Sequence, residues 1–347
     1  MRVSLSPHTT VLFGANGQGK TNFLEACYLV STLRPLRAQK LSELVRHGEE
    51  SARVAARFQL PGGVREVEVE VRAGARLARV DGKPVRDPDE LFGGLATVAF
   101  TPDDLAVVKS GPEGRRRLLD RAAQNRHPAQ IVDARDYLRA LRSRNHLLRQ
   151  RAQSDLLASF DEPLARLGAR LRQRREQVLD ELRPHAQRAF SEVARGEAAL
   201  ELSYLSSVPE AAEEALRDAL EKRLPRDLER GYTSVGPHAD DLALSLGGRP
   251  ARLYASQGQA RAIVLAFKIA EIENLRATQG RAPLLLLDDV SSELDPERNA
   301  FLMTYLGALK GQVVLTTTDP RLVSKSAAGP ALFHRVFAGR IEVADPS

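Results

Sequence analysis

The sequence of 347 residues contains no tryptophan, two methionines and a single cysteine. One cysteine cannot form an internal disulfide, which is typical of a reducing compartment, so we expect a cytoplasmic protein. One cysteine and seven scattered histidines also lack the spacing of a zinc site. No apolar run approaches the roughly 18 residues of a membrane span, and the first residues do not resemble a signal peptide, so we expect no membrane association.

Aromatic residues are also scarce, at 5% of the chain. Hydrophobic residues make up 43% and charged residues 28%, which is ordinary for a globular protein with a real core. This composition excludes a mainly disordered chain. The length indicates two or three domains.

The net charge of +6 is unevenly distributed along the chain. Residues 111–190 contain 18 arginines, no lysine and 10 acidic residues, so this segment carries +8 and the remainder about −2. A basic segment on a near-neutral body favours a polyanionic partner. A solvated helical surface explains the charge alone equally well.

The two ends of the chain have the pattern of an α/β protein. Three short apolar runs, at 11–13, 284–287 and 313–315, predict buried strands of a mostly parallel sheet. Alternation of apolar and charged residues between Ala52 and Val80 predicts an antiparallel sheet, with a hairpin turn at Asp81-Gly82.

The middle of the chain, from Pro112 to about Leu228, has a helical pattern. One apolar stripe runs from Phe160 to Leu182, and we expect Asp161 to cap this helix with Pro163 in its first turn. A second helix is predicted around residues 131–148. The arginine-rich outer faces suggest a helical arm inserted into one α/β domain.

A glycine-rich segment between a predicted strand and a predicted helix matches the phosphate-binding pattern G-x-x-x-x-G-K-[ST]. It reads Gly14, Ala15, Asn16, Gly17, Gln18, Gly19, Lys20, Thr21, and Asn22 follows it. Glycines let backbone N–H groups surround phosphates, and the following helix points its positive end at them. We therefore expect residues 14–22 to bind ATP, with Lys20 at the β and γ phosphates and Thr21 on Mg²⁺.

Two acidic residues follow the apolar run at 284–287. We expect Asp288 to hold the Mg²⁺ and Asp289 to polarise the attacking water. Lys20 and Asp289 are thus the candidate catalytic residues. Two exposed acids at a strand end would be the simpler interpretation, but the glycine-rich segment argues against it.

A third motif precedes a predicted helix, 32 residues before Asp288, and consists of Ser256, Gln257, Gly258 and Gln259. It resembles the signature motif of ABC-type ATPases, in which the signature of one subunit closes on the γ-phosphate held by the other. Residues 291–295 likewise resemble the D-loop of that family. A plain helix cap would explain Ser256 if the other motifs were absent.

Taken together, the chain resembles the RecF family of DNA replication and repair proteins. The resemblance rests on segments 14–26, 100–105, 108–112, 115–120, 236–242, 254–261, 288–290 and 316–319. These segments are spread over nearly the whole chain and occur in the same order as in the family. The double aspartate at 288–289, where transporters usually carry Asp-Glu, favours the same family.

The resemblance implies an α/β fold: an ABC-type, SMC-like ATPase head with an antiparallel β subdomain and an inserted α-helical arm. The head would comprise residues 1–110 and 229–347, with the β subdomain at about 51–100, and the arm would comprise 111–228. The family implies a weak, DNA-stimulated ATPase that forms a homodimer on ATP. It binds duplex DNA beside single-stranded gaps and cooperates with RecO and RecR to load the recombinase.

The chain departs from the family pattern at three places. The segment that usually precedes the phosphate-binding loop is absent, which leaves the adenine contacts unassigned. Ala15 stands where glutamate is common. No histidine follows the predicted strand at 313–315, so Thr317, Thr318 or Asp319 is the candidate substitute.

Other readings remain open at this point. The ATP-binding subunit of a membrane transporter is one alternative, although 236 residues separate Lys20 from Ser256, far more than in transporters. A P-loop kinase of small molecules is another. His238 has either a nucleotide-linked or a purely structural role, and we expect Cys27 to pack in the core.

The arginines of the predicted arm give a specific DNA hypothesis. We expect Arg172, Arg174 and Arg175 to contact phosphates, or else to form a solvated face. In the second case the DNA surface would lie on the head, around residues 65–79.

Overall fold

The computed structural model describes residues 1–38, 40–60, 62–85, 95–194, 198–324 and 331–345. Its central sheet has the strand order β13-β12-β1-β11-β10-β6, and only β13 is antiparallel to its neighbour. The strands are β1 (Thr9–Phe13), β6 (Thr97–Phe100), β10 (Leu284–Asp288), β11 (Val313–Thr317), β12 (Ala331–Phe337) and β13 (Arg340–Val343). All residues of β10 and β11 are buried, which explains their continuous apolar runs. The predicted parallel sheet is confirmed.

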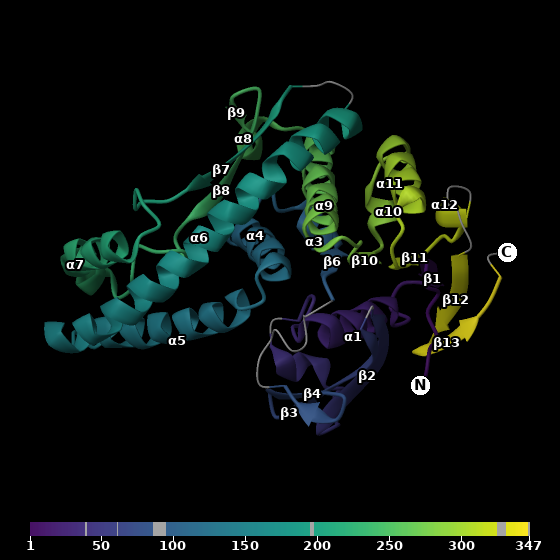
Figure 1. The fold of residues 1–347 in the computed structure, drawn as a ribbon, viewed down its shortest axis with the longest axis horizontal. Helices are drawn as coiled ribbons and strands as arrows, with labels where there is room; N and C mark the ends of the chain where they lie inside the picture. The colour runs from purple at the N-terminus through teal and green to yellow at the C-terminus, as the bar shows by residue number, and fades with distance from the viewer. Residues whose placement is uncertain (39, 61, 86–94, 195–197, 325–330, 346–347) are drawn as a thin grey trace.

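Helices cover both faces of this sheet (Figure 1). The helix α1 (Lys20–Thr32) follows β1 and packs Leu24 and Tyr28 against one face. The helices α9 (Gln257–Gln279) and α11 (Pro296–Ala308) contribute to a separate core on the other face. Because helices cover both faces of the sheet, a ligand can reach the side chains of the sheet only at the ends of the strands.

The predicted antiparallel sheet is also present. It consists of β2 (Ser51–Leu60), β3 (Gly63–Arg72), β4 (Ala75–Val80) and β5 (Lys83–Pro84). The valines at alternate positions of β3 are buried against the second half of α1. Asp81 and Gly82 have φ of 51° and 78°, as a two-residue hairpin turn requires, so the predicted turn is confirmed.

The four long helices of the middle segment are α4 (Pro112–Arg126), α5 (Gln130–Arg149), α6 (Ser154–Val193) and α7 (Glu213–Arg230). Of these, α4 packs in the core of the head. Figure 1 shows α5, α6 and α7 extending away from the central sheet. The far part has its own core, in which Tyr137 of α5, Leu164 of α6 and Leu216 of α7 pack together. The second half of α6 joins the core of the head beside α9. One helix of 40 residues therefore belongs to both cores.

The helical prediction for 112–228 needs one correction. It misses β7 (Leu200–Leu205), which pairs with β8 (Asp241–Leu246) and through it with β9 (Arg249–Pro250) in a three-stranded sheet. Leu200 and Leu202 are buried at alternate positions, which is the period of a strand. The other short elements of the described residues are a 3₁₀ helix at Leu41–Leu44, α3 (Pro102–Leu105), α8 (Ala251–Tyr254), α10 (Val290–Glu293) and α12 (Arg321–Ser324).

The predicted start of the long helix is wrong. The helix begins at Ser154, so Asp161 does not cap it and Pro163 lies inside it. The helix begins earlier because Leu157 continues the apolar stripe and is fully buried. Asp161 instead accepts a hydrogen bond of 2.8 Å from Nε of the buried Arg144.

The expected role of Arg172, Arg174 and Arg175 is also corrected. Arg172 and Arg175 are each only 5% exposed. Arg175 forms two hydrogen bonds with the carboxylate of Asp120, at 2.7 and 2.9 Å, and Arg174 donates to Asp133 at 2.7 Å. Arg172 and Arg175 are therefore buried in contacts that hold the arm together and form neither a DNA surface nor a solvated face, and Arg174 is half-buried and paired with Asp133. None of the described helices is long and apolar enough to cross a bilayer.

Candidate nucleotide site

The glycine-rich segment forms the loop between β1 and α1. Gly14, Gly17 and Gly19 have φ of 154°, 77° and 105°, values that favour glycine. At Gly14 a Cβ would also lie 2.4 Å from the carbonyl oxygen of Val336 in β12, so no larger residue fits there. Gly19 precedes α1 without a side-chain cap, which leaves the first N–H groups of the helix available to an anion.

A neighbouring hairpin holds this loop in place. The turn between β12 and β13 donates two backbone hydrogen bonds to Gln18: Ala338 N to Oε1 at 2.7 Å, and Gly339 N to the carbonyl oxygen at 3.1 Å. Ala15, Asn16 and Gly17 remain exposed at the crest of the loop. The loop is therefore fixed at Gln18 and open where a phosphate would enter.

Lys20 lies across the inside of the loop. Its Nζ donates to the carbonyl oxygens of Gly14 at 2.7 Å and Ala15 at 3.0 Å. Burial lowers its pKa, and the nearby carboxylates of Asp289 and Asp288 partly oppose that shift. The sequence alone could not place this cation, and the structure sets it between the loop and both aspartates.

Two threonine side chains from distant parts of the chain meet at Asp288. Thr21 Oγ1 and Thr316 Oγ1 each donate to Asp288 Oδ1 at 2.9 Å. Thr21 lies at the start of α1, just after β1, Thr316 lies near the end of β11, and Asp288 ends β10. The three residues are close because the carboxyl ends of these parallel strands share one edge of the sheet. Thr316 was not among the predicted residues. It directly precedes Thr317, Thr318 and Asp319, the candidate substitutes for the missing histidine.

Asp289 has an unusual backbone and a partly buried carboxyl group. Its φ of 50° places it in the left-handed region, and its N–H donates to Thr316 Oγ1 at 3.0 Å. Its Oδ1 is buried without a hydrogen-bond partner among the described residues. Burial raises the pKa of this carboxyl, while hydrogen bonding from Ser292 and the charge of Lys20 partly lower it. A buried oxygen without a partner is suited to binding a water molecule.

Both aspartates line one cavity of about 180 Å³ together with the loop. Its other lining residues are Asn16, Gly17, Gly19, Lys20, Thr21 and Asn22. The structure thus brings the loop and the two acids into one site, although 267 residues separate Thr21 from Asp288.

Arg37 is a further site residue that the sequence did not reveal. One Nη of its guanidinium lies 3.5 Å from Asp288 Oδ2, and its Nε lies 3.9 Å from Asp103. The carboxylate of Glu25 in α1 accepts hydrogen bonds from the backbone N–H groups of Leu36 and Arg37 and so holds this segment. No sequence motif marks Arg37, because only the fold brings it to Asp288.

The signature segment lies outside this cavity. Ser256 precedes α9 and forms a reciprocal cap with Gln259, whose N–H donates to Ser256 Oγ at 3.1 Å. Ser256 and Gln257 are exposed, and Gly258 lies beside the guanidinium of Arg298. The segment 256–259 is absent from the residues that line the cavity of its own chain.

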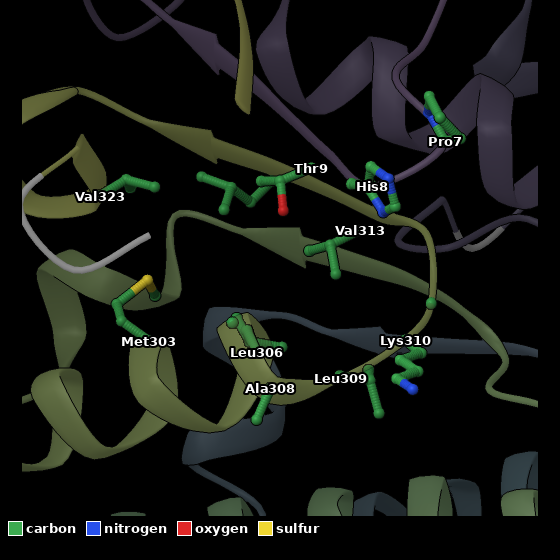
Figure 2. Close-up of a pocket in the computed structure, with 13 residues that line it drawn as sticks. Pro7, His8, Thr9, Met303, Leu306, Ala308, Leu309, Lys310, Val313 and Val323 are labelled. Carbon is green, nitrogen blue, oxygen red and sulfur yellow. The ribbon is translucent and has the colours of Figure 1, made fainter. Parts of the chain in front are cut away.

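A second, larger cavity of about 570 Å³ lies elsewhere (Figure 2). His8 and Thr9 line it at the start of β1, Val313 at the start of β11, and Met303 and Leu306 of α11 contribute apolar atoms. These are the amino ends of parallel strands, whereas ligands of such sheets bind at the carboxyl ends. This cavity is therefore not part of the nucleotide site.

His238 and Cys27, which belong to none of the motifs above, both make contacts typical of structural residues. His238 Nδ1 lies 2.7 Å from Tyr137 Oη, and its Nε2 lies 2.9 Å from the carbonyl oxygen of Thr233, so both ring nitrogens are engaged within the arm. Cys27 packs against the core beneath α1, and burial raises the pKa of its thiol to about 12. The prediction that Cys27 is a packing residue is confirmed.

Comparisons with known proteins agree with this geometry. The family model described as RecF/RecN/SMC N terminal domain matches residues 1–337. The DNA replication and repair protein RecF of Anaeromyxobacter dehalogenans (strain 2CP-C) is 57% identical over 346 residues, which cover 96% of this chain and 92% of that protein. The protein of the same name from Myxococcus xanthus is 53% identical, with 99% of this chain and 93% of that protein covered.

A solved structure is similar over nearly the whole chain. It is described as the recombination mediator protein RecF-ATP in RecFOR pathway, and it is 32% identical with a TM-score of 0.86, covering 99% of this chain and 93% of its own. These findings confirm the predicted α/β ATPase-head fold. The chain belongs to the RecF/RecN/SMC N-terminal domain family and, within it, to the RecF family of DNA replication and repair proteins.

Proposed function

We propose that this chain is an ATP-binding DNA repair protein in which ATP hydrolysis acts as a switch for DNA binding. The observation that carries this proposal is the contact between Thr21 and Asp288, 2.9 Å apart, inside the cavity that the glycine-rich loop encloses. The name of the RecF-ATP structure supports nucleotide binding by the same fold.

The residues present fit a nucleotide with its metal. The loop N–H groups and Lys20 would hold the phosphates. Thr21 and Asp288 offer a hydroxyl and a carboxylate, which are hard oxygen ligands suited to Mg²⁺. When bound, the metal would neutralise phosphate charge. The described residues contain no larger cluster of metal-binding side chains, and Mg²⁺ in phosphate sites needs only one or two protein ligands.

Hydrolysis would use Asp289 as the group that orients and polarises water. Its Oδ1 has no partner among the described residues and lies in the wall of the cavity. Burial raises its pKa, which makes it a better proton acceptor than an ordinary carboxylate. We expect this ATPase to be weak and stimulated by DNA, as in the family resemblance.

The active form would be a homodimer assembled on ATP. The signature segment cannot act on its own cavity in this conformation, because residues 256–259 do not line it. Beside Ser256, the apolar side chains of Leu253 and Tyr254 are 70% and 65% exposed, which supports burial against a second copy. Ser256 of one copy would then meet the nucleotide held by the other.

The expected partners follow from the family. We propose binding to duplex DNA beside single-stranded gaps in the cytoplasm, cooperation with RecO and RecR, and assistance in loading the recombinase. The named relatives support a role in replication and repair. A transporter subunit is not supported, because similarity over nearly the whole chain is to RecF proteins. A small-molecule kinase loses support on the same ground.

Sedimentation tests the proposal directly. Protein would be analysed with ATP, with ADP and without nucleotide, each with and without gapped DNA. We expect dimers, and DNA bound to them, only with ATP. Monomers under every condition would overturn the dimeric switch, and absence of DNA binding under every condition would overturn the repair function.

A further inference from the structure

One face of α5 presents a row of basic side chains. Positions 135, 139, 142, 146 and 149 recur at the spacing of one helix face, and all five residues are exposed. They are Arg135, Arg139, Arg142, His146 and Arg149, here called the α5 stripe. The opposite face of the helix, with Tyr137, Leu141 and Leu148, is buried.

The stripe is poor in compensating negative charge. From Leu138 to Arg149 the helix contains no acidic residue. Arg142 and Arg149 donate through Nε to carbonyl oxygens of their own helix, both at 3.1 Å, and within the described residues neither forms an ion pair. Arg135 is bound to Asp136 at 2.9 Å, and the same carboxylate acts at longer range on Arg139.

Most other arm arginines are already committed to carboxylates. Arg144 is fully buried between Asp161 and Asp227, and Arg115 binds Asp241 at 2.8 Å. The positive segment detected in the sequence therefore divides in two. Many arginines are paired within the arm, whereas the arginines of the α5 stripe lie together on one exposed helix face.

Two arginines outside α5, Arg34 and Arg76, are candidates to extend the stripe beyond its first residue, Arg135. Burial lowers the pKa of Arg76 in β4, and the positive charges of Arg34, in the segment after α1, and Arg135 lower it further. Arg34 and Arg76 are half-buried and form no side-chain ion pair within the described residues. Asp120 is the carboxylate that acts on Arg34, but Arg175 already binds it through two hydrogen bonds.

We propose that the α5 stripe, with Arg76 and Arg34 at its inner end, is the surface that binds the phosphate backbone of duplex DNA. The stripe is about 21 Å long from Arg135 to Arg149, since a helix rises about 1.5 Å per residue. Duplex DNA carries a charge about every 1.7 Å along its axis, so several phosphates face a surface of this length. The α5 stripe itself consists of four arginines and one histidine, without the tryptophan, tyrosine or phenylalanine that commonly stack on bases, which favours backbone contacts over sequence readout.

This inference rests on the proposed DNA-binding function and gives it a location. Figure 1 shows α5 at the margin of the arm, on the side of the molecule where the antiparallel sheet lies. The location replaces the hypothesis of Arg172, Arg174 and Arg175, whose side chains are committed to contacts within the arm.

The test compares two triple variants that change charge equally. The stripe variant carries Arg139→Gln, Arg142→Gln and Arg149→Gln. The control carries Lys222→Gln, Arg226→Gln and Arg230→Gln on α7, another exposed basic set of the same arm, interspersed with acidic residues. Fluorescence anisotropy with a labelled 30-base-pair duplex would measure affinity with ATP at several salt concentrations, and circular dichroism and ATP binding would verify folding.

We expect the stripe variant to bind at least about tenfold more weakly, with a salt slope smaller by about 2.7 because about 0.9 is lost per phosphate contact. The control should keep both values. Equal affinity and slope in wild type and stripe variant would overturn the location, as would equal losses in the two variants. If the wild-type protein does not bind the duplex, the proposed DNA-binding function itself is overturned. If the wild-type protein binds and the stripe variant behaves like it, the function stands and the location is overturned.

A single change tests the inner end of the surface. Arg76→Gln should weaken duplex binding and reduce the slope by about 0.9. Arg53→Gln on the same antiparallel sheet is the matched control, because Arg53 is paired with Glu68. A loss in the control as large as that in Arg76→Gln would exclude Arg76 from the surface.

Discussion

At the scale of residues, the nearest partner decides what each charged side chain can do. Lys20 and Asp289 both line the nucleotide cavity, yet burial shifts their pKa values in opposite directions. Burial disfavours the charged form of either group, so the pKa of the amine falls and that of the carboxyl rises. The charge of each group partly opposes the shift that burial causes in the other.

We predict that Lys20→Met weakens ATP binding about 10- to 100-fold. The change removes a charge-assisted contact to the phosphates, which is worth about 1.5–3 kcal/mol. Isothermal titration with ATP measures the loss, and Arg166→Met on the exposed face of α6 is a control that should bind normally. Unchanged affinity in Lys20→Met would remove this residue from the site.

We predict that Asp289→Asn binds ATP but hydrolyses it about 10²- to 10⁴-fold more slowly, since the water-polarising carboxylate is lost. The raised pKa of Asp289 adds a pH dependence. The carboxylate form is active, so the wild-type rate should rise with pH through a value above that of an ordinary aspartate, and the variant should lose this rise. Steady-state ATPase assays from pH 4 to pH 7 provide the measurement.

At the scale of elements, α6 connects the arm to the head. Its first half packs with α5 and α7, and its second half packs beside α9, whose first residues form the signature segment. The buried Arg144 ties the first half together by binding Asp161 of α6 and Asp227 of α7. A displacement of α9 on dimer formation would therefore act directly on a helix of the arm.

We predict that Arg144→Met destabilises the protein by about 3–5 kcal/mol, because it leaves two buried carboxylates without their cation. The melting temperature should fall accordingly in thermal denaturation. Arg166→Met is the control, since its side chain is exposed and forms no ion pair among the described residues. Equal melting temperatures for the two variants would show that the buried network contributes no net stability.

We predict that Ser256→Arg prevents ATP-dependent dimerisation and leaves ATP binding by the monomer intact. Ser256 is exposed and does not line the cavity of its own chain, so a bulky cation there should obstruct only the second copy. Sedimentation with saturating ATP distinguishes the outcomes, with Gln279→Arg at the other end of α9 as the control. Normal dimers in Ser256→Arg would contradict a site shared between copies.

At the scale of the whole molecule, dimer formation would double the basic surface. Two copies joined through their signature segments would present two α5 stripes to one duplex, so a contact made by one copy raises the effective concentration of the other. Nucleotide state would then control DNA affinity without any change in the contacts of a single copy.

We predict that ATP raises the affinity for duplex DNA and steepens its salt dependence relative to ADP. More phosphates are neutralised by two stripes than by one, and each adds about 0.9 to the slope. Duplexes of unrelated sequence should bind alike, because phosphate contacts carry no sequence information. Anisotropy titrations with two sequences would test this, and equal slopes with ATP and ADP would argue against a doubled surface.

The sequence by itself determined the class of the fold and the candidate residues of the site. The glycine-rich loop, the Asp288-Asp289 pair and the apolar strands are local patterns, and local patterns follow from backbone sterics and from burial on both faces of a sheet. Arg37, Thr316 and the start of α6 were not predictable in this way. The positions of Arg37 and Thr316 depend on which elements the fold brings together. The start of α6 depends on how far neighbouring elements bury its apolar stripe.

The tertiary structure alone decided which arginines build the protein and which remain available to a partner. In sequence, Arg139, Arg142, Arg172 and Arg175 are equivalent members of one basic segment. Packing of α6 against its neighbours buries Arg172 and Arg175 beside acceptors, whereas Arg139 and Arg142 lie on the uncovered face of α5. The physical reason is that a buried charge requires a partner and an exposed one does not, and only the fold determines which residues are covered.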